Sequence, residues 1–166
     1  MPGEMNHKEI TKAHTLTEMR SKGFNPNKLV TLLGHQYSSL NDVNGAYMHT
    51  INVLQRKIYG RYGKKIKHMA VAETGHQHFD VGKGSHIHAL IECDEDWLEI
   101  DKWQDAIKDT WKKTRVGTSI SLVNDRADAN VTWFEDVYNL DDAVGYCYKQ
   151  SEDKQSERYQ FIGRNY

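Results

Sequence analysis

The stretch from His86 to Ile91 constrains the fold most, because histidines and apolar residues alternate at its start. Successive side chains of a β-strand point to opposite faces, so the pattern predicts a strand whose Ile87 and Ala89 face a core. His86 and His88 then share the other face, with Cα atoms about 6.6 Å apart at a rise of roughly 3.3 Å per residue. Two imidazoles at that spacing can bind one metal ion.

Four other segments have the pattern of strands, and helical patterns separate them. Strands are predicted over 28–37, 66–73, 86–92, 118–123 and 130–138. A polar stretch over 75–85 would join the second strand to the third as a hairpin loop. This order predicts an α+β fold with a central, mainly antiparallel five-stranded sheet and helices packed on it.

Capping residues and apolar spacing predict the helices. The first begins at a capping box over Thr15–Glu18 and runs to about Gly23. The second follows from Asn44, the third is capped by Asp101, and the last is capped by Asn139. The second and third helices have apolar stripes that we expect to face the core: Met48, Ile51, Leu54 and Ile58, and Trp103, Ile107 and Trp111.

Length and composition indicate one soluble domain. The chain has 166 residues, and we expect an N-terminal helical extension over 1–27, a main domain over 28–151 and a C-terminal tail over 152–166. No apolar run approaches the roughly 18 residues of a membrane span, so no membrane contact is expected. Met1–Ile10 lacks the apolar stretch of a signal peptide. Cys93 and Cys147 lie outside any Cys-x-x-Cys pair, which favours a reducing cytosolic or nuclear setting.

Charge is unevenly distributed, although the net charge is only −1. The segment 92–109 is acidic and would repel phosphates. The segment 55–68 contains basic residues and no acid, so its side chains are candidate DNA contacts. The alternative is that both segments are solvated helix faces. The basic candidates are Arg56, Lys57, Arg61, Lys64, Lys65 and Lys67.

A third metal ligand can be sought on the strand before the histidine pair. Glu73 ends that strand, and the hairpin would bring its carboxylate beside His86 and His88. One carboxylate and two imidazoles suit a divalent cation and leave positions open for water or substrate. His76 and His78, in the loop between the strands, are alternative ligands.

Tyr146 is a candidate nucleophile, placed in the first turns of the last helix, which we expect to carry residues 146–150. At about 100° per residue, Lys149 and Gln150 share its face and Tyr148 points elsewhere. A phenol, with a pKa of about 10, becomes a useful nucleophile once a cation stabilises its anion. Lys149 can supply that cation. The alternative is a core tyrosine beside a surface lysine.

These residues resemble the nuclease domain of rolling-circle replication initiators, in the His-hydrophobic-His (HUH) endonuclease superfamily. The resemblance covers roughly residues 28–150. Its first motif would lie at Val30–Leu33, its second is His86-Ile87-His88, and Glu73 takes the place of a frequent third ligand. Its third motif, Tyr-x-x-Lys on a helix, is matched by Tyr146 and Lys149. The tyrosine follows the histidines and has no second tyrosine on its helix face, as in single-tyrosine enzymes.

The resemblance implies a ferredoxin/RRM-like nuclease fold over the main domain and a Mg²⁺ or Mn²⁺ ion held by the histidine pair and Glu73. It implies that Tyr146 nicks single-stranded or hairpin origin DNA, keeps the 5′ phosphate and leaves a 3′ hydroxyl that primes replication. A host helicase and polymerase would be partners. The setting would be a host cytoplasm for a plasmid or phage protein, and the nucleus for one from a eukaryotic virus.

Three alternatives remain open from the sequence. Single-tyrosine transposases of insertion sequences use a glutamine four residues after the tyrosine as a metal ligand, which Gln150 matches. A cupin would use His86, His88 and Glu92, but in an all-β fold. A non-catalytic nucleic-acid-binding module would stack bases on exposed aromatic residues. The candidates for such stacking are Trp133, Phe134 and Tyr138.

Overall fold

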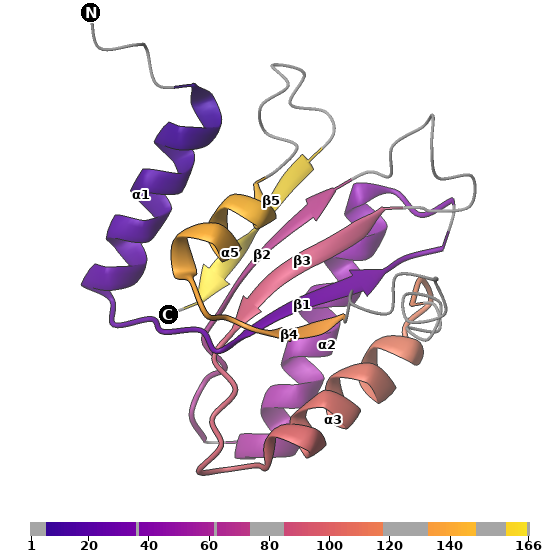
Figure 1. The fold of residues 1–166 in the computed structure, drawn as a ribbon. Coiled ribbons are helices and arrows are strands. Elements are labelled where there is room, and N and C mark those ends of the chain that lie inside the picture. Colours follow the sequence, from indigo (N-terminus) through magenta and orange to yellow (C-terminus); the bar gives the residue numbers. More distant parts are fainter. Residues whose placement is uncertain are drawn as a thin grey trace, which may run out of the picture.

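An antiparallel sheet in the order β4-β1-β3-β2-β5 forms the centre of the fold (Figure 1). The computed structural model describes residues 6–35, 37–61, 63–73, 85–117 and 133–148 in full, and 159–165 as backbone. The predicted α+β class and antiparallel sheet are confirmed. The strands are β1 (Lys28–Leu33), β2 (His68–Glu73), β3 (His86–Ile91), β4 (Phe134–Asp136) and β5 (Tyr159–Asn165).

The strands that form the sheet differ in part from those predicted. β5 lies in the segment expected to be a tail and pairs with the outer edge of β2. The predicted strand over 118–123 and most of the polar loop over 75–85 lie outside the described residues. β1 ends at Leu33, four residues before the predicted end, and β4 is shorter than the predicted strand over 130–138.

Helices cover both faces of the sheet (Figure 1). On one face, α2 (Leu40–Tyr59) and α3 (Ile100–Lys112) pack against a core to which β3 contributes Ile87, Ala89 and Ile91, as predicted. On the other face, α1 (His7–Ser21) and α5 (Leu140–Cys147) pack against a second core that includes Leu90. Because side chains of a strand alternate, His86 and His88 belong to the face covered by α1 and α5.

The N-terminal helix is longer than the sequence predicts. α1 begins at His7, because the side chain of Asn6 accepts a hydrogen bond from the backbone N–H of Glu9. The predicted capping box at Thr15 is wrong, since Thr15 lies inside this helix and is only 1% exposed. The hydroxyl of Thr15 lies 3.3 Å from that of Tyr148, so it joins α1 to the C-terminal end of α5.

Two other helix starts also needed correction. α2 begins at Leu40, not at Asn44, because Ser39 and Asp42 form a capping box. Met48, expected to face the core, is 36% exposed, because the buried stripe of α2 runs through Tyr47 and not through Met48. α3 begins at Ile100, so Asp101 lies in its first turn and is not its cap. The residues of α2 that face the core are Val43, Tyr47, Thr50, Ile51 and Leu54, and in α3 the predicted Trp103, Ile107 and Trp111 are buried.

The last helix has the predicted cap and a different end. The side chain of Asn139 accepts a hydrogen bond from the backbone N–H of Asp142, as its position predicts. The helix stops at Cys147, so Tyr146 lies in its last turn and not in its first turns. Lys149 and Gln150, expected on the same helix, lie outside the described residues. Among the described residues, no helix has both the length and the apolar character needed to cross a membrane.

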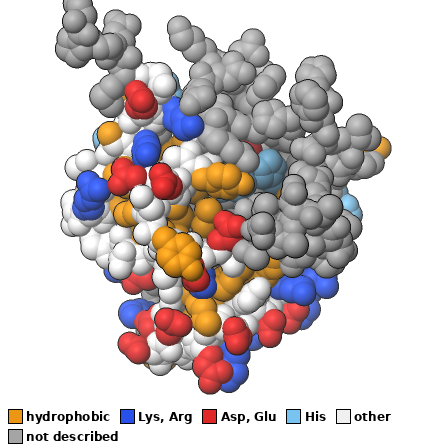
Figure 2. Space-filling view, viewed as in Figure 1, with side chains coloured by type: hydrophobic (Ala, Val, Ile, Leu, Met, Phe, Trp, Pro, Cys, Tyr) orange, Lys and Arg blue, Asp and Glu red, His pale blue; other side chains and the backbone are white. Residues whose placement is uncertain are grey.

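The basic and acidic segments meet at one end of the sheet. Basic residues lie in the last turn of α2 and between α2 and the start of β2, and most are exposed. Acidic side chains gather where α3 begins (Figure 2). Lys64 Nζ lies 2.6 Å from Asp94 Oδ2, so one predicted DNA contact is engaged in an ion pair. The basic segment therefore lies at the opposite end of β2 from Glu73 and does not line the site described next.

Candidate metal centre and nucleophile

The pairing of β2 with β3 brings the three predicted ligands together. Glu73 and His86 are direct partners in the antiparallel register, so their side chains lie on the same face of the sheet. His88 follows two residues later on that face. Glu73 Oε2 lies 3.2 Å from His86 Nε2 and 3.1 Å from His88 Nε2.

This cluster could hold a metal ion, as the sequence predicts. Each residue offers one ligand atom, and these atoms lie within 4.8 Å of one another. The side chains of Glu73 and His88 are 0% and 1% exposed, while that of His86 is 12% exposed. A carboxylate oxygen and two imidazole nitrogens fit a divalent cation, and the partly exposed histidine marks the side from which one could enter.

The charge of Glu73 is stabilised within the cluster. Burial raises the pKa of this carboxyl, but hydrogen bonds from His86 and His88 outweigh it and hold the pKa at about 2. Glu73 is therefore an anion at neutral pH. The two Nε2–H groups that donate to it occupy the direction from which a cation would be bound, so binding would displace those protons.

Thr31 supports His88 from the neighbouring strand. The two residues are partners in the register of β1 and β3, and Thr31 Oγ1 lies 3.2 Å from His88 Nδ1. An imidazole that binds a metal through Nε2 carries its proton on Nδ1 and needs an acceptor for it. The Thr31 hydroxyl can accept a hydrogen bond from that N–H when a metal is bound, and can donate to Nδ1 when Nε2–H donates to Glu73. Thr31 lies in the segment proposed as the first motif, and this contact could not be predicted from the sequence.

Tyr146 is placed beside the cluster by α5. Its ring meets the ring of His88 edge-on, with centroids 4.7 Å apart and an interplanar angle of 70°. Tyr146 is 41% exposed, so substrate can reach it from solvent. Tyr148 is 2% exposed and its hydroxyl contacts Thr15 in the core between α1 and α5. Of these two tyrosines, Tyr146 is therefore the one at the candidate site.

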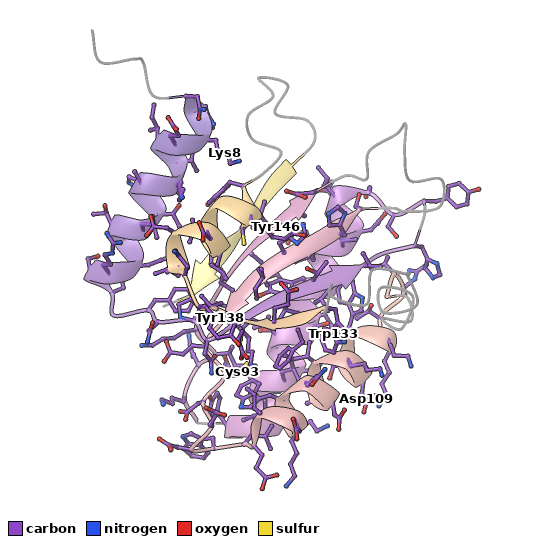
Figure 3. All side chains as sticks on the ribbon, in the orientation of Figure 1. Lys8, Cys93, Asp109, Trp133, Tyr138 and Tyr146 are labelled. Atoms are coloured by element: carbon purple, nitrogen blue, oxygen red, sulfur yellow. The ribbon has the colours of Figure 1, made fainter. Side chains whose placement is uncertain are left out.

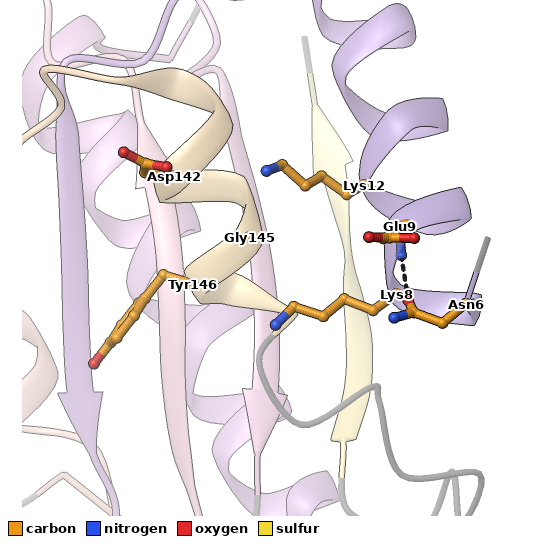
Figure 4. Close-up of a pocket in the computed structure, with 7 residues that line it drawn as sticks. All are labelled: Asn6, Lys8, Glu9, Lys12, Asp142, Gly145 and Tyr146. Carbon is orange, nitrogen blue, oxygen red and sulfur yellow. Dashed lines mark hydrogen bonds between the residues drawn. The ribbon is translucent and has the colours of Figure 1, made fainter. Parts of the chain in front are cut away.

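Tyr146 also lines an open pocket of about 460 Å³ between α1 and α5 (Figure 4). Lys8 and Lys12 of α1 reach into it, and neither was a candidate from the sequence. The signal was their spacing of four residues, which places them on one helix face with Thr15 and Leu16. The sequence places the helix start at Thr15, so Lys8 and Lys12 fall outside the predicted helix.

Other candidates lie away from the cluster or outside the described residues. Glu92, required by the cupin alternative, accepts a hydrogen bond from the backbone N–H of Asn25 at the other end of β3. The alternative ligands His76 and His78 lie outside the described residues. Trp133 and Tyr138 flank β4 (Figure 3), and Trp133 is buried whereas Tyr138 is 92% exposed. Phe134 is buried at 9% exposure, so only Tyr138 of the three offers an open ring.

The chain matches no protein-family model, no curated protein and no solved structure. The interpretation of the site therefore depends on its own geometry and on the motifs in the sequence.

Proposed function

We propose that the chain is a metal-dependent, single-tyrosine HUH endonuclease and strand transferase that acts on single-stranded DNA. The observation that carries the proposal is the contact of Tyr146 with His88, a member of the Glu73, His86 and His88 cluster. A hydroxyl nucleophile, an ionised carboxylate and two imidazoles thereby occur together on one face of the central strands. The ferredoxin/RRM-like nuclease fold is part of the same proposal.

Glu73, His86 and His88 would hold a Mg²⁺ or Mn²⁺ ion. When bound, the ion would polarise an oxygen of the scissile phosphate. The buried carboxylate gives the cluster a fixed negative charge, and Thr31 fixes the orientation of the imidazole of His88. Mg²⁺ and Mn²⁺ suit a site that mixes carboxylate and imidazole and keeps open positions.

Tyr146 would supply the attacking oxygen. In the proposed step, Tyr146 Oη forms a bond to phosphorus while the bond from phosphorus to the 3′ oxygen of the preceding nucleotide breaks. The phenol loses its proton to solvent, and the leaving 3′ oxygen takes up a proton, so the products are a 5′-phosphotyrosine and a 3′ hydroxyl. The phosphotyrosine keeps the energy of the broken bond, and a second 3′ hydroxyl can reverse the step and join strands.

Two features support DNA as the substrate. Tyr146 is exposed on an open pocket rather than enclosed, so a long polymer can pass it. The two half-buried lysines of the same pocket can meet phosphates (Figure 4). The proposed substrate is the single-stranded or hairpin form of a replication origin, with a host helicase and polymerase as partners.

The cupin alternative is wrong, because cupins are all-β and helices cover both faces of this sheet. The transposase alternative shares the fold class, the metal cluster and the tyrosine, and differs in the expected role of Gln150. A non-catalytic binding module would not require Tyr146 beside His88. The experiment below separates that module from an enzyme.

The test is covalent capture. The protein is incubated with Mn²⁺ and a mixed pool of single-stranded oligonucleotides, denatured, and analysed by gel shift and mass spectrometry. We expect a denaturant-resistant adduct on Tyr146, absent with EDTA and absent in Tyr146→Phe. Tyr138→Phe is the matched control, since it removes an exposed hydroxyl far from the cluster. The proposal fails if the wild-type protein forms no adduct or if Tyr146→Phe forms one.

A further inference from the structure

The N-terminal helix is docked on the helix that carries Tyr146. Leu16 and Met19 of α1 pack with Val144 and Cys147 of α5 in one apolar cluster. The hydroxyls of Thr15 and Tyr148 meet beneath this interface. At the other end, Arg20 Nη2 lies 3.7 Å from Asp141 Oδ2. These contacts fix the position of α1 relative to α5, so the residues of its first turns are held beside Tyr146.

The face of α1 that points toward α5 is basic in its first turns and packs in the core in its last turns. Positions 8, 12, 15 and 19 follow one another at helical spacing, and the last two are buried in the core between the helices. Lys8 and Lys12 are half-buried on the same face, one turn or about 6 Å apart along the axis. Figure 4 shows both side chains reaching from α1 toward α5.

Lys12 lies close to the backbone of α5. Position 145 is glycine, and a Cβ placed there would lie 3.5 Å from Lys12 Nζ and 3.7 Å from its Cε. Lys12 therefore lies against the helix surface one residue before Tyr146, at ordinary van der Waals distance from where a Cβ would be. α5 has no basic residue in its own last turn. Its C-terminal end, where carbonyl groups give a partial negative charge, faces cations contributed by another helix.

Two acidic residues share the pocket with these lysines. Glu9 and Asp142 also line it, but both are exposed. Salt largely screens exposed charges only when they lie more than about 10 Å apart at ordinary ionic strength, so these acids also act on a ligand in the pocket. The pocket that Tyr146 lines also contains the two half-buried lysines of α1.

We infer that Lys8 and Lys12 form a phosphate-binding site for the DNA strand that Tyr146 attacks, so that α1 belongs to the substrate site. This inference rests on the proposed function and deepens it, because it assigns the path of the strand to the pocket between α1 and α5. The basic segment over 55–68, at the far end of β2, does not have this role. Lys8 and Lys12 hold the backbone and recognise no base.

The test uses a 5′-fluorescein-labelled, 20-nucleotide single strand of mixed sequence, with the full chain in EDTA so that no cleavage occurs. Affinity is measured by anisotropy at several salt concentrations. In the double variant Lys8→Gln/Lys12→Gln we expect roughly tenfold weaker binding. The slope of log affinity against log salt should fall by about 1.4, which corresponds to two lost phosphate contacts on a single strand.

Two further variants control this result. Lys22→Gln removes one positive charge at the far end of α1 and should leave affinity and slope near wild type. Lys8→Arg/Lys12→Arg keeps the charges and should restore binding, which a loss of folding in the glutamine variant would not explain. The inference is overturned if the glutamine variant keeps the wild-type salt slope or if the arginine variant does not restore binding. It is also overturned if the wild-type protein does not bind the strand.

The covalent capture assay distinguishes this failure from that of the proposed function. An adduct on Tyr146, formed equally by wild type and by the glutamine variant, with unchanged binding, would leave the enzyme in place and remove the lysine site. Lysine-dependent binding with no adduct in the wild type would keep the lysine site and remove the proposed enzyme activity.

Discussion

Thr31 and His88 are partners across β1 and β3, and Thr31 Oγ1 lies 3.2 Å from His88 Nδ1. This contact fixes which nitrogen of His88 faces Glu73. Thr31→Val keeps the shape of the side chain and removes the acceptor, so we expect affinity for Mn²⁺ to fall about tenfold, as for other partners of metal-binding histidines. Titration calorimetry measures this affinity for Mn²⁺. Thr31→Ser, which keeps the hydroxyl, should bind near wild type, and equal affinities for all three proteins would refute the role.

Glu73 should make Mn²⁺ a stabiliser of the fold. A ligand that binds only the folded state at 100 times its Kd adds about 2.7 kcal/mol to the free energy of unfolding, or roughly 5–10 °C in Tm for a chain of this size. Thermal scans with and without Mn²⁺ should show this rise in the wild type and in Glu95→Gln, an exposed control. Glu73→Gln should show almost none. A full rise in Glu73→Gln would transfer the third-ligand role to other groups, with His76 and His78 the first to examine.

Tyr148 should be structural, in contrast to its neighbour Tyr146. Tyr148→Phe removes a buried hydroxyl that meets Thr15, so we expect a loss of about 1 kcal/mol in the free energy of unfolding, measured by urea denaturation. Formation of the DNA adduct should be unaffected. Loss of the adduct in a variant of unchanged stability would mean that the wrong tyrosine has been assigned.

His68 should make stability depend on pH in a range separate from that of Glu73. Burial lowers the pKa of His68 to about 4, from an ordinary value of 6.5, and its Nδ1 lies 3.0 Å from the hydroxyl of Tyr47. Between these two pKa values, His68 is therefore protonated in the unfolded chain and neutral in the folded chain. The stabilisation is complete above pH 6.5 and is lost as the pH falls toward 4, by about 3 kcal/mol.

The comparison for this effect is His68→Gln, which keeps a hydrogen-bonding group and cannot titrate. Urea denaturation in EDTA, from pH 7.5 to 4.5, should give a steeper loss of stability in the wild type than in the variant. Parallel profiles would show that the burial of His68 has no such cost.

Lys149 and Gln150 separate the replication initiator from the transposase. For an initiator, Lys149→Ala should slow nicking at saturating Mn²⁺ with little change in metal affinity, and Gln150→Ala should be mild. For a transposase-like enzyme, Gln150→Ala should weaken metal binding, because its carbonyl would be a ligand. A Mn²⁺ titration of the nicking rate in both variants decides between them, and we expect the first pattern.

The sequence was sufficient to predict the cluster, because its determinants are local. Alternation in β3 fixes the face shared by His86 and His88, and the hairpin connection places Glu73 beside them. The same alternation predicted the apolar face of β3. Asn139 was found as a cap because a capping side chain acts within three residues of its own position.

What the sequence did not reveal depends on contacts between distant segments. Residues 159–165 have no strong strand pattern of their own, and they form a strand because they pair with β2. The early start of α1 is an exception, because Asn6 and Glu9, three positions later, form a local capping pattern that is present in the sequence. Lys8 and Lys12 become site candidates only once α1 is known to pack on α5, and that packing joins the first helix to the last.

The pairing of β5 with β2 also governs the order in which the site can be completed during synthesis. β2 leaves the ribosome well before residues 159–165, so the outer edge of the strand that ends in Glu73 waits for its partner. An unpaired strand edge is open to pairing with other chains. In the nascent protein, the strand that contributes the carboxylate ligand therefore keeps one open edge until β5 has been synthesised.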